Sequence, residues 1–269
     1  TWCFFHPSMD EQARRRLDLA NSLRTALQRD EFHLVYQPQV YADSGRVFGA
    51  EALLRWQPTG EGLVSPAEFI PVAEEIGLIL PLGEWVIQQA CDQARRWQDA
   101  GLNCRVAVNV SGVQIYRSDV VAALQRAAQH AGISPALIQL ELTESTLIDD
   151  SILIQDVIGG LKAIGASVAI DDFGTGYSSL AYLKRFKVDK LKIDRSFIAD
   201  AATNEEGAAM SRAVISIARS LNMRAIAEGV ETADQLAFLL GAGCNEIQGY
   251  YFSKPLLPDA FADFAQRHR

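Results

Sequence analysis

The feature of the sequence that most constrains its fold is a repeated alternation of short apolar segments with longer amphipathic ones. Eight short segments have the composition and the flanking turn residues that are typical of strands. From the third onward they recur at intervals of roughly 30 residues, which is the length of a β/α unit. The expected strands span 32–41, 47–56, 104–110, 137–142, 167–171, 188–193, 224–227 and 246–248.

Helical patterns fill most of the intervals between these strands. Capping-box spacing, which marks the start of a helix, begins at Ser65, Thr203 and Thr232. Glycines stand where helices are expected to end, namely at Gly101, Gly132, Gly165 and Gly241. The expected helices span 10–29, 66–75, 83–100, 119–131, 152–164, 178–185, 205–220 and 233–240.

Strands that alternate with helices indicate parallel β/α units, and eight of them predict an α/β protein with a TIM-like (β/α)8 barrel. The first two strands depart from this pattern, because only residues 42–46 connect them. So short a connection forms a hairpin, and the barrel is therefore expected to have an antiparallel first strand. An open doubly wound sheet is the competing architecture. The 269 residues suit one barrel domain.

Composition excludes several classes of function. The net charge of −8 argues against binding of duplex nucleic acid, which requires a basic surface. The four cysteines and four histidines are scattered, with no spacing that predicts a zinc site or a disulfide framework. No apolar run is long enough to cross a bilayer. An acidic pocket that binds divalent cations could still take a phosphorylated ligand.

Polar and charged residues stand at one end of almost every expected strand, where barrel enzymes carry their catalytic groups. They are Glu51, Arg55, Asn109, Glu141, Thr143, Glu144, Asp171, Asp172, Lys192, Asp194, Glu228, Glu231 and Gln248. Several buried carboxylates around one lysine need further cations. Oxygen ligands without histidine or cysteine favour Mg²⁺, Mn²⁺ or Ca²⁺, and adjacent acids such as Asp171 and Asp172 suit a two-metal site.

Each of these residues alone also has a structural explanation. Glu51 or Glu141 could form a salt bridge in the barrel core, and Lys192 could pair with Asp194. Asp171 and its successors could form only a turn, since aspartate and glycine favour turns. All of these explanations would have to hold at equivalent strand ends. The pattern therefore favours a metal-dependent phosphodiester hydrolase.

Seven short motifs follow one another in order along the chain. They are 51–56 (EALLRW), 109–111 (NVS), 141–144 (ELTE), 171–180 (DDFGTGYSSL), 192–194 (KID), 228–231 (EGVE) and 248–250 (QGY). Together they resemble the EAL domain family of cyclic di-GMP phosphodiesterases over about residues 20–265. One Glu-Ala-Leu tripeptide would be a trivial match, whereas seven ordered motifs at strand ends are specific.

The resemblance implies hydrolysis of cyclic di-GMP to linear 5′-pGpG, in which two divalent metal ions assist the attack of a bound water. The ions would be Mg²⁺ or Mn²⁺, with Ca²⁺ inhibitory. The residues that match the metal ligands are Glu51, Asn109, Glu141 and Asp171 for one ion, and Asp171, Asp172 and Glu228 for the other. Lys192, Glu228 and Glu51 match the catalytic residues, and the first two would position the water and assist proton transfer.

The resemblance also implies a substrate site. Arg55 would bind a phosphate of the ligand, while Leu53 and Gln37 would contact the dinucleotide. Asp194 and Gln248 complete the residues expected to bind substrate, and Gln248 would form a hydrogen bond near the water or the second metal.

The resemblance also implies a loop that connects this site to the interface of a homodimer. Its residues are Phe173, Gly174, Thr175 and Gly176, and Glu231 resembles its anchor.

Residues 1–19 resemble the tail of a preceding diguanylate cyclase-type (GGDEF) domain and its connecting helix, and 20–269 the phosphodiesterase domain. We therefore expect a cytoplasmic domain of a larger signalling protein that also carries sensor domains, in a parent that can be anchored in the inner membrane.

Two alternatives of other classes stay open. One is a non-catalytic receptor for cyclic di-GMP, which would require loss of a metal ligand or of Lys192, and neither is lost. The other is an enolase-type barrel enzyme that uses Mg²⁺ to abstract protons. That reading explains the acids but not Arg55, the adjacent aspartates and the glycine-rich loop together.

Overall fold

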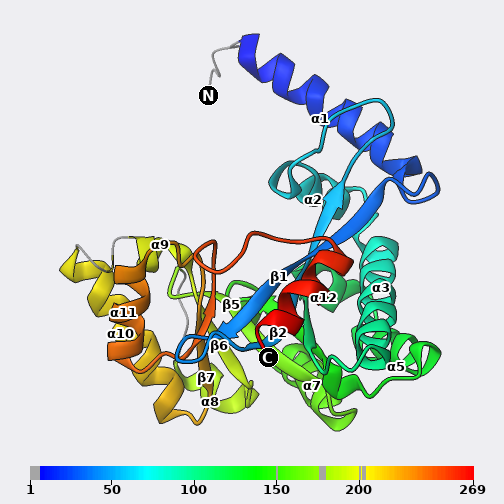
Figure 1. Ribbon diagram of the computed structural model, residues 1–269. Helices are drawn as coiled ribbons and strands as arrows, with labels where there is room; N and C mark the ends of the chain where they lie inside the picture. The colour runs from blue at the N-terminus through cyan, green and yellow to red at the C-terminus, as the bar shows by residue number, and fades with distance from the viewer. Residues whose placement is uncertain (1–6, 150, 176–179, 200, 202–203) are drawn as a thin grey trace.

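A computed structural model describes residues 7–149, 151–175, 180–199, 201 and 204–269, and its centre is a closed barrel of eight strands (Figure 1). The strands are β1 (Phe32–Tyr41), β2 (Val47–Trp56), β3 (Arg105–Val110), β4 (Ile138–Thr143), β5 (Ser167–Phe173), β6 (Lys190–Ile193), β7 (Arg224–Ala227) and β8 (Glu246–Gln248). The predicted barrel is confirmed, and every expected strand is present within two residues of its predicted bounds.

The direction of β1 is also confirmed. It pairs antiparallel with β2 on one side and with β8 on the other, and Phe32 lies opposite Trp56. All other neighbouring strands are parallel. Gly45 turns the connecting hairpin in the left-handed region, at φ +71°.

Helices surround the barrel on its outer side (Figure 1). Eight correspond to expected helices: α1 (Pro7–Ala26), α2 (Pro66–Glu75), α3 (Ile79–Asp99), α5 (Val120–Ala131), α7 (Ser151–Ala163), α8 (Leu180–Phe186), α10 (Glu205–Ser220) and α11 (Ala233–Ala242). Five further helical segments were not predicted: α4 (Gly112–Arg117), the 3-10 turn η1 (Pro135–Leu137), α6 (Thr146–Asp149), α9 (Arg195–Ala199) and α12 (Pro258–Arg267).

The predicted helix signals have mixed outcomes. Thr232 forms the expected capping box, whereas Ser65 makes no side-chain cap, so that prediction was wrong although α2 does begin there. Gly241 lies inside α11, and Gly243 ends that helix with φ +85°. Thr203 lies outside the described residues.

The strands divide the side chains between an apolar shell and a polar barrel interior. Outward-facing residues such as Val108 and Leu140 pack against the helices in the main core. Alternate residues face inward, because successive side chains of a strand point to opposite faces. The buried polar residues of the strands are Gln37, Gln39, Glu51, Gln139, Glu141, Ser167, Lys190, Lys192, Glu246 and Gln248. The barrel interior is therefore filled by polar groups, where branched apolar side chains are usual.

Helix α1 extends away from the barrel and contacts it through α2 (Figure 1). Its end is anchored by Leu23 and Ala26, which are fully buried in a second apolar cluster with Phe69 of α2. Among the described residues, no helix is both long and apolar enough to cross a membrane.

Candidate active site

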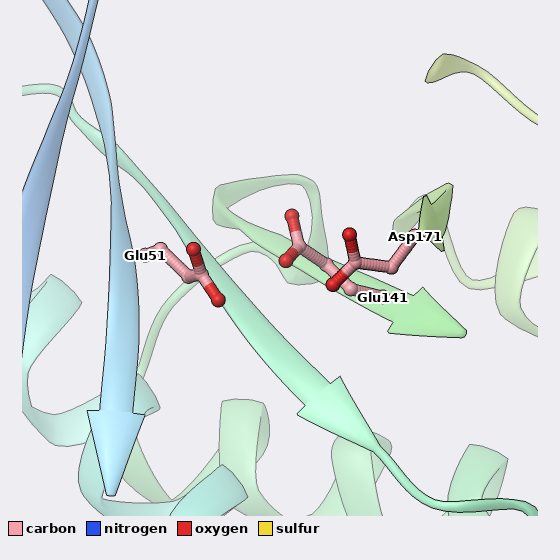
Figure 2. Close-up of side chains that lie close together, drawn as sticks. All are labelled: Glu51, Glu141 and Asp171. Carbon is pink, nitrogen blue, oxygen red and sulfur yellow. The ribbon is translucent and has the colours of Figure 1, made fainter. Parts of the chain in front are cut away.

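The carboxylates at the strand ends converge on one point of the barrel. Glu51 comes from β2, Glu141 from β4 and Asp171 from β5, and one oxygen of each lies within 4.8 Å of the other two. Figure 2 shows the three side chains turned toward a common space. Parallel neighbours in close register bring them together, since Asn109 pairs with Glu141 and Thr143 with Asp171.

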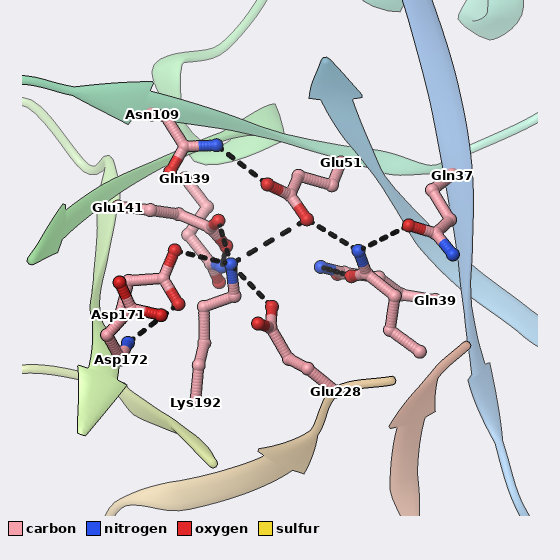
Figure 3. Close-up of polar contacts among 11 residues, drawn as sticks. Gln37, Gln39, Glu51, Asn109, Gln139, Glu141, Asp171, Asp172, Lys192 and Glu228 are labelled. Carbon is pink, nitrogen blue, oxygen red and sulfur yellow. Dashed lines mark hydrogen bonds and ion pairs between the residues drawn. The ribbon is translucent and has the colours of Figure 1, made fainter. Parts of the chain in front are cut away.

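Lys192 of β6 lies at the centre of this ring (Figure 3). Its Nζ is 2.5 Å from Glu141 Oε2, 2.7 Å from Glu228 Oε1, 3.0 Å from Asp171 Oδ2 and 3.7 Å from Glu51 Oε2. Four carboxylates thus share one ammonium group. The structure brings these five predicted site residues together.

The excess of acid at the ring changes the protonation of its members. Burial raises the pKa of Glu141 to about 7, and although Lys192 opposes this rise, Glu51 and Asp171 add to it. Burial likewise raises the pKa of Glu228 well above its usual range. Burial disfavours the charge of Lys192, yet the surrounding carboxylates hold its pKa well above its ordinary value. One lysine is therefore too little positive charge for the ring.

A β-bulge lets two consecutive aspartates serve the same site. Side chains of consecutive strand residues normally point to opposite faces. The pairing of β5 with β6 shifts between Ile170 and Phe173, and Asp172 adopts a left-handed conformation with φ +54°. As a result Asp171 and Asp172 both lie within 4.8 Å of Glu228, counted between one oxygen of each. Burial raises the pKa of Asp172 to about 6, with further contributions from Asp171 and Asp194.

Amide side chains hold Glu51 from both sides. Asn109 Nδ2 donates to its Oε1 at 2.6 Å, and Gln248 Nε2 donates to its Oε2. The same Gln248 nitrogen lies 3.1 Å from Gln37 Oε1. Gln248 can take this position because β8 is followed by Gly249, where any Cβ would lie 2.1 Å from the backbone oxygen of Val230.

The ring fits divalent cations. Glu51, Glu141 and Asp171 form one cluster of oxygen donors, and Asp171, Asp172 and Glu228 form a second. Both consist of hard carboxylate oxygens, which suit Mg²⁺ and Mn²⁺. Asp171 belongs to both clusters, so a bridging position for this residue is compatible with the arrangement.

Leu53 and Arg55 lie on β2 beyond Glu51, beside the ring. With Asn109 they are part of the lining of a cavity of about 650 Å³, whose other walls come from α2, α3, α4, the end of β4 and the start of α6. Arg55 is half-buried and donates to the backbone oxygen of Leu54 at 2.9 Å. The carboxylates of the ring do not line this cavity; Asn109, which lines it, also donates a hydrogen bond to Glu51 and so connects the cavity to the ring.

Asp194 follows β6 and accepts a hydrogen bond from the backbone nitrogen of Ser196 at 3.0 Å. It also lies close enough to Asp172 to raise the pKa of that carboxyl group. Asp194 therefore lies at the rim beside the second carboxylate cluster, outside the ring.

The predicted coupling residues lie at the end of β5 and after β7. Phe173 is buried, Thr175 is exposed, and Gly174 adopts φ +100° with its nitrogen 2.6 Å from Glu144 Oε2. The backbone oxygen of Glu144 also accepts a hydrogen bond from the backbone nitrogen of Leu147. Glu144 thus fixes the start of the loop in place. Glu231 is exposed, and its backbone nitrogen donates to Gln235. Gly176 lies outside the described residues.

Two interior residues in contact with the site were not predicted. Gln39 and Gln139 are 2% and 1% exposed, and they donate hydrogen bonds to Gln248 and Glu141. The available signal was their spacing, since each lies on a strand two residues from a predicted site residue and must face the same side.

Comparison with known proteins identifies the family. The EAL domain model matches residues 20–255. The chain is 43% identical over 256 residues to the bifunctional diguanylate cyclase/cyclic di-GMP phosphodiesterase MucR of Pseudomonas aeruginosa, covering 95% of this chain and 37% of that protein. It is 42% identical over 267 residues to the cyclic di-GMP phosphodiesterase PdeR of Escherichia coli, covering 99% and 40%. The chain thus spans less than half the length of these relatives.

Solved structures agree with this assignment. The complex of the PaMucR phosphodiesterase with c-di-GMP matches with a TM-score of 0.88 at 42% identity, over 91% of this chain and 99% of that one. The EAL domain of Mycobacterium smegmatis DcpA matches with a TM-score of 0.74 at 35% identity, over 88% and 96%. The resemblance in the seven motifs is thereby confirmed, and the chain belongs to the EAL domain family.

Proposed function

We propose that this domain is a metal-dependent phosphodiesterase that hydrolyses cyclic di-GMP to linear 5′-pGpG. The observation that carries the proposal is the pair of carboxylate clusters that share Asp171 at the barrel mouth. The substrate is supported by relatives named as cyclic di-GMP phosphodiesterases, MucR and PdeR. The adjoining cavity beside Arg55 offers space for a dinucleotide.

Two divalent cations, Mg²⁺ or Mn²⁺, would be held by the carboxylates of the two clusters. Asn109 would join the first cluster through its amide oxygen, which requires the amide to turn because its nitrogen now faces Glu51. Bound there, the cations would supply Lewis-acid activation of a water and would offset the charge of the phosphate.

Lys192 and Glu228 are suited to manage the proton of the attacking water. Lys192 keeps its positive charge because its pKa is raised, so it can orient an oxygen by donating hydrogen bonds. Of the four carboxylates around it, Glu228 has the most exposed side chain, at 18%, compared with 13% for Asp171 and 0% for Glu141. This exposure leaves Glu228 accessible to a water at the ring, so it is suited to accept a proton there.

The reaction adds the water oxygen to phosphorus and breaks the bond from phosphorus to the ribose 3′-oxygen. One water proton passes to Glu228, and the 3′-oxygen leaves with a proton from solvent. Arg55 would pair with a phosphate oxygen through charge-assisted hydrogen bonds. Leu53, Gln37 and Asp194 would contact the rest of the ligand.

The test is turnover of cyclic di-GMP in Mg²⁺, Mn²⁺ or Ca²⁺, followed by chromatography of the products. We expect pGpG with Mg²⁺ and Mn²⁺, none with Ca²⁺, and no product with EDTA. Glu51→Ala should abolish turnover, while Glu84→Ala, which removes an exposed carboxylate on α3, should not. Hydrolysis that survives both EDTA and Glu51→Ala would contradict the metal assignment. Tight binding without turnover in either metal would favour the receptor alternative.

The proposal extends to the assembly in which the domain works. Phe173, Gly174, Thr175 and Gly176 would couple the site to a homodimer interface, with Glu231 as the anchor. MucR is named as a cyclase as well as a phosphodiesterase, which supports a GGDEF domain in the parent protein. Its position upstream of this domain and a cytoplasmic setting belong to the same proposal. Residues 1–19 would then connect to it, with the phosphodiesterase domain from residue 20. The mass of the domain in solution, with and without cyclic di-GMP, tests the dimer.

A further inference from the structure

Two buried glutamines lie in the barrel interior next to the carboxylate ring. Gln139 of β4 donates from Nε2 to Glu141 Oε1 at 2.9 Å, and Gln39 of β1 donates from Nε2 to Gln248 Oε1 at 3.0 Å (Figure 3). Both are almost completely buried. Hydrogen bonds in such a place are costly to break, because the freed polar atom has no water to replace its partner.

The barrel is built to place Gln39 there. Antiparallel pairing sets Gln39 opposite Gln248 on one side and opposite Gly49 on the other. A Cβ at Gly49 would lie 3.1 Å from Gln39 Oε1, so the glycine leaves the space that the glutamine occupies. Gln139 needs no such device, because it lies two residues before Glu141 on the same strand.

Each glutamine removes a degree of freedom from the site. Because Gln139 holds Glu141 Oε1, the other oxygen, Oε2, is the one turned toward Lys192. Because Gln39 donates to the amide oxygen of Gln248, that amide must direct its nitrogen toward Glu51. The orientation of Gln248 is thus set by a residue that does not touch the ring.

We propose that Gln139 and Gln39 are positioning residues that orient Glu141 and Glu51 for a divalent cation. This inference rests on the proposed function only in that the ring must bind a cation, and it does not depend on which phosphodiester is cleaved. Outer partners of metal ligands set ligand orientation, and their loss weakens metal binding or activity by about 10–100-fold.

The test compares Mn²⁺ affinity of the substrate-free domain by isothermal titration calorimetry. Gln139→Met and Gln39→Met keep the length of the side chain and remove the donor. Gln93→Met is the matched control, because Gln93 is a buried glutamine of α3 that accepts a hydrogen bond from Arg96, away from the ring. We expect about 10–100-fold weaker Mn²⁺ binding for Gln139→Met, a smaller loss for Gln39→Met, which acts through Gln248, and no change for Gln93→Met.

Two further measurements separate positioning from general destabilisation. Saturating Mn²⁺ should restore much of the turnover of Gln139→Met, because the defect lies in metal binding. If that variant does not fold, Gln139→Asn keeps an amide that is one methylene too short to reach Glu141. The proposal would be overturned if Gln139→Met and Gln139→Asn both bound Mn²⁺ with wild-type affinity. It would also be overturned if Gln93→Met lost as much Mn²⁺ affinity as Gln139→Met.

The outcomes also distinguish this inference from the proposed function. If the unaltered domain binds Mn²⁺ but does not cleave cyclic di-GMP, the proposed function fails and the affinity comparison still decides the role of the glutamines. If it binds neither Mn²⁺ nor Mg²⁺, both proposals fail.

Discussion

Two buried lysines on the same strand, Lys190 and Lys192, have opposite electrostatic surroundings. Lys190 lies 2.7 Å from one carboxylate, Glu246, whose other oxygen is 3.1 Å from Arg224. Its ammonium group also lies 4.7 Å from the ring centre of Phe48. Lys192, two residues later, faces four carboxylates. Burial lowers the pKa of Lys190, whereas the pKa of Lys192 is raised well above its usual range.

The difference separates a structural ion pair from a binding site. Around Lys190, two cations meet one carboxylate, so the charge needs no further positive partner. Around Lys192 the acids are in excess, and additional cations would relieve their repulsion. Both sites contain a buried lysine, so burial alone does not distinguish them. The excess of carboxylates over cations around Lys192 is what indicates a candidate functional site.

The largest expected effect is on turnover. Lys192→Met should lower kcat by about 10²–10⁴-fold, because it removes the group that we propose orients the water. Lys190→Met should cause a much smaller loss, since Lys190 does not contact the ring carboxylates. Steady-state formation of pGpG at saturating Mn²⁺, below the melting temperature of each variant, measures both. Equal losses would remove the distinction between the two lysines.

The next effect is on stability. Lys190→Met should lower the free energy of unfolding by about 3 kcal/mol, because it leaves Glu246 buried with only Arg224 as a partner. Urea unfolding followed by circular dichroism measures the change. Lys190→Met combined with Glu246→Gln should recover much of the loss, since the uncompensated charge is then gone. A double variant no more stable than the single one would show that packing dominates.

The third effect is the pH dependence of the metal-free domain. The pKa of Glu141 is about 7 in the folded protein, whereas its ordinary value is 4.5. Between pH 4.5 and about pH 7 the folded state therefore binds a proton at Glu141 that the unfolded state has lost. Stability should therefore fall as the pH rises from about 4.5 to about 7, by up to about 3 kcal/mol. Glu141→Gln should make this fall smaller, and the remaining fall should come from Asp172 and Glu228, whose pKa values are also raised. Glu84→Gln, on the exposed face of α3, should leave it unchanged.

The smallest effect is stabilisation by the metal itself. Mn²⁺ at about 100 times its dissociation constant should add about 2.7 kcal/mol to the free energy of unfolding, because only the folded state gathers the ligands. A thermal shift with and without Mn²⁺ measures this. Lys190→Met should retain the increment and Glu51→Ala should lose most of it. An increment that persists in Glu51→Ala would place the cation elsewhere.

The strands could be predicted from the sequence, while some helices could not. Strand patterns are local, and all eight were found. Helices α4, α6 and α9 have between four and six residues, too few to show a helical period. Helix α12 did carry a signal, Pro258 in its first turn, but it follows the last strand and lies outside the β/α alternation on which the predicted helices were based. Gly241 and Gly243 are equally plausible helix ends in sequence, and only packing selects the second.

The candidate site was predictable where a residue ends a strand and unpredictable where it depends on pairing. Glu51, Glu141 and Asp171 follow from their positions in the motifs. The contact of Gln39 with Gln248 joins strands 209 residues apart, and it depends on a register that no local pattern encodes. Asp172 was expected as a metal ligand from the resemblance, but the direction of its side chain is set by a bulge that no local pattern encodes.

The reversal of β1 also determines on which side the chain enters the barrel. In a barrel whose strands are all parallel, the first strand begins at the end opposite the catalytic mouth. Here Phe32, the first residue of β1, lies opposite Trp56, the last residue of β2, so the chain arrives at the mouth itself. Helix α1 accordingly leads into the barrel from the side of the candidate active site. A movement of α1 would reach α2, and with it the wall of the cavity beside Arg55, without crossing the barrel.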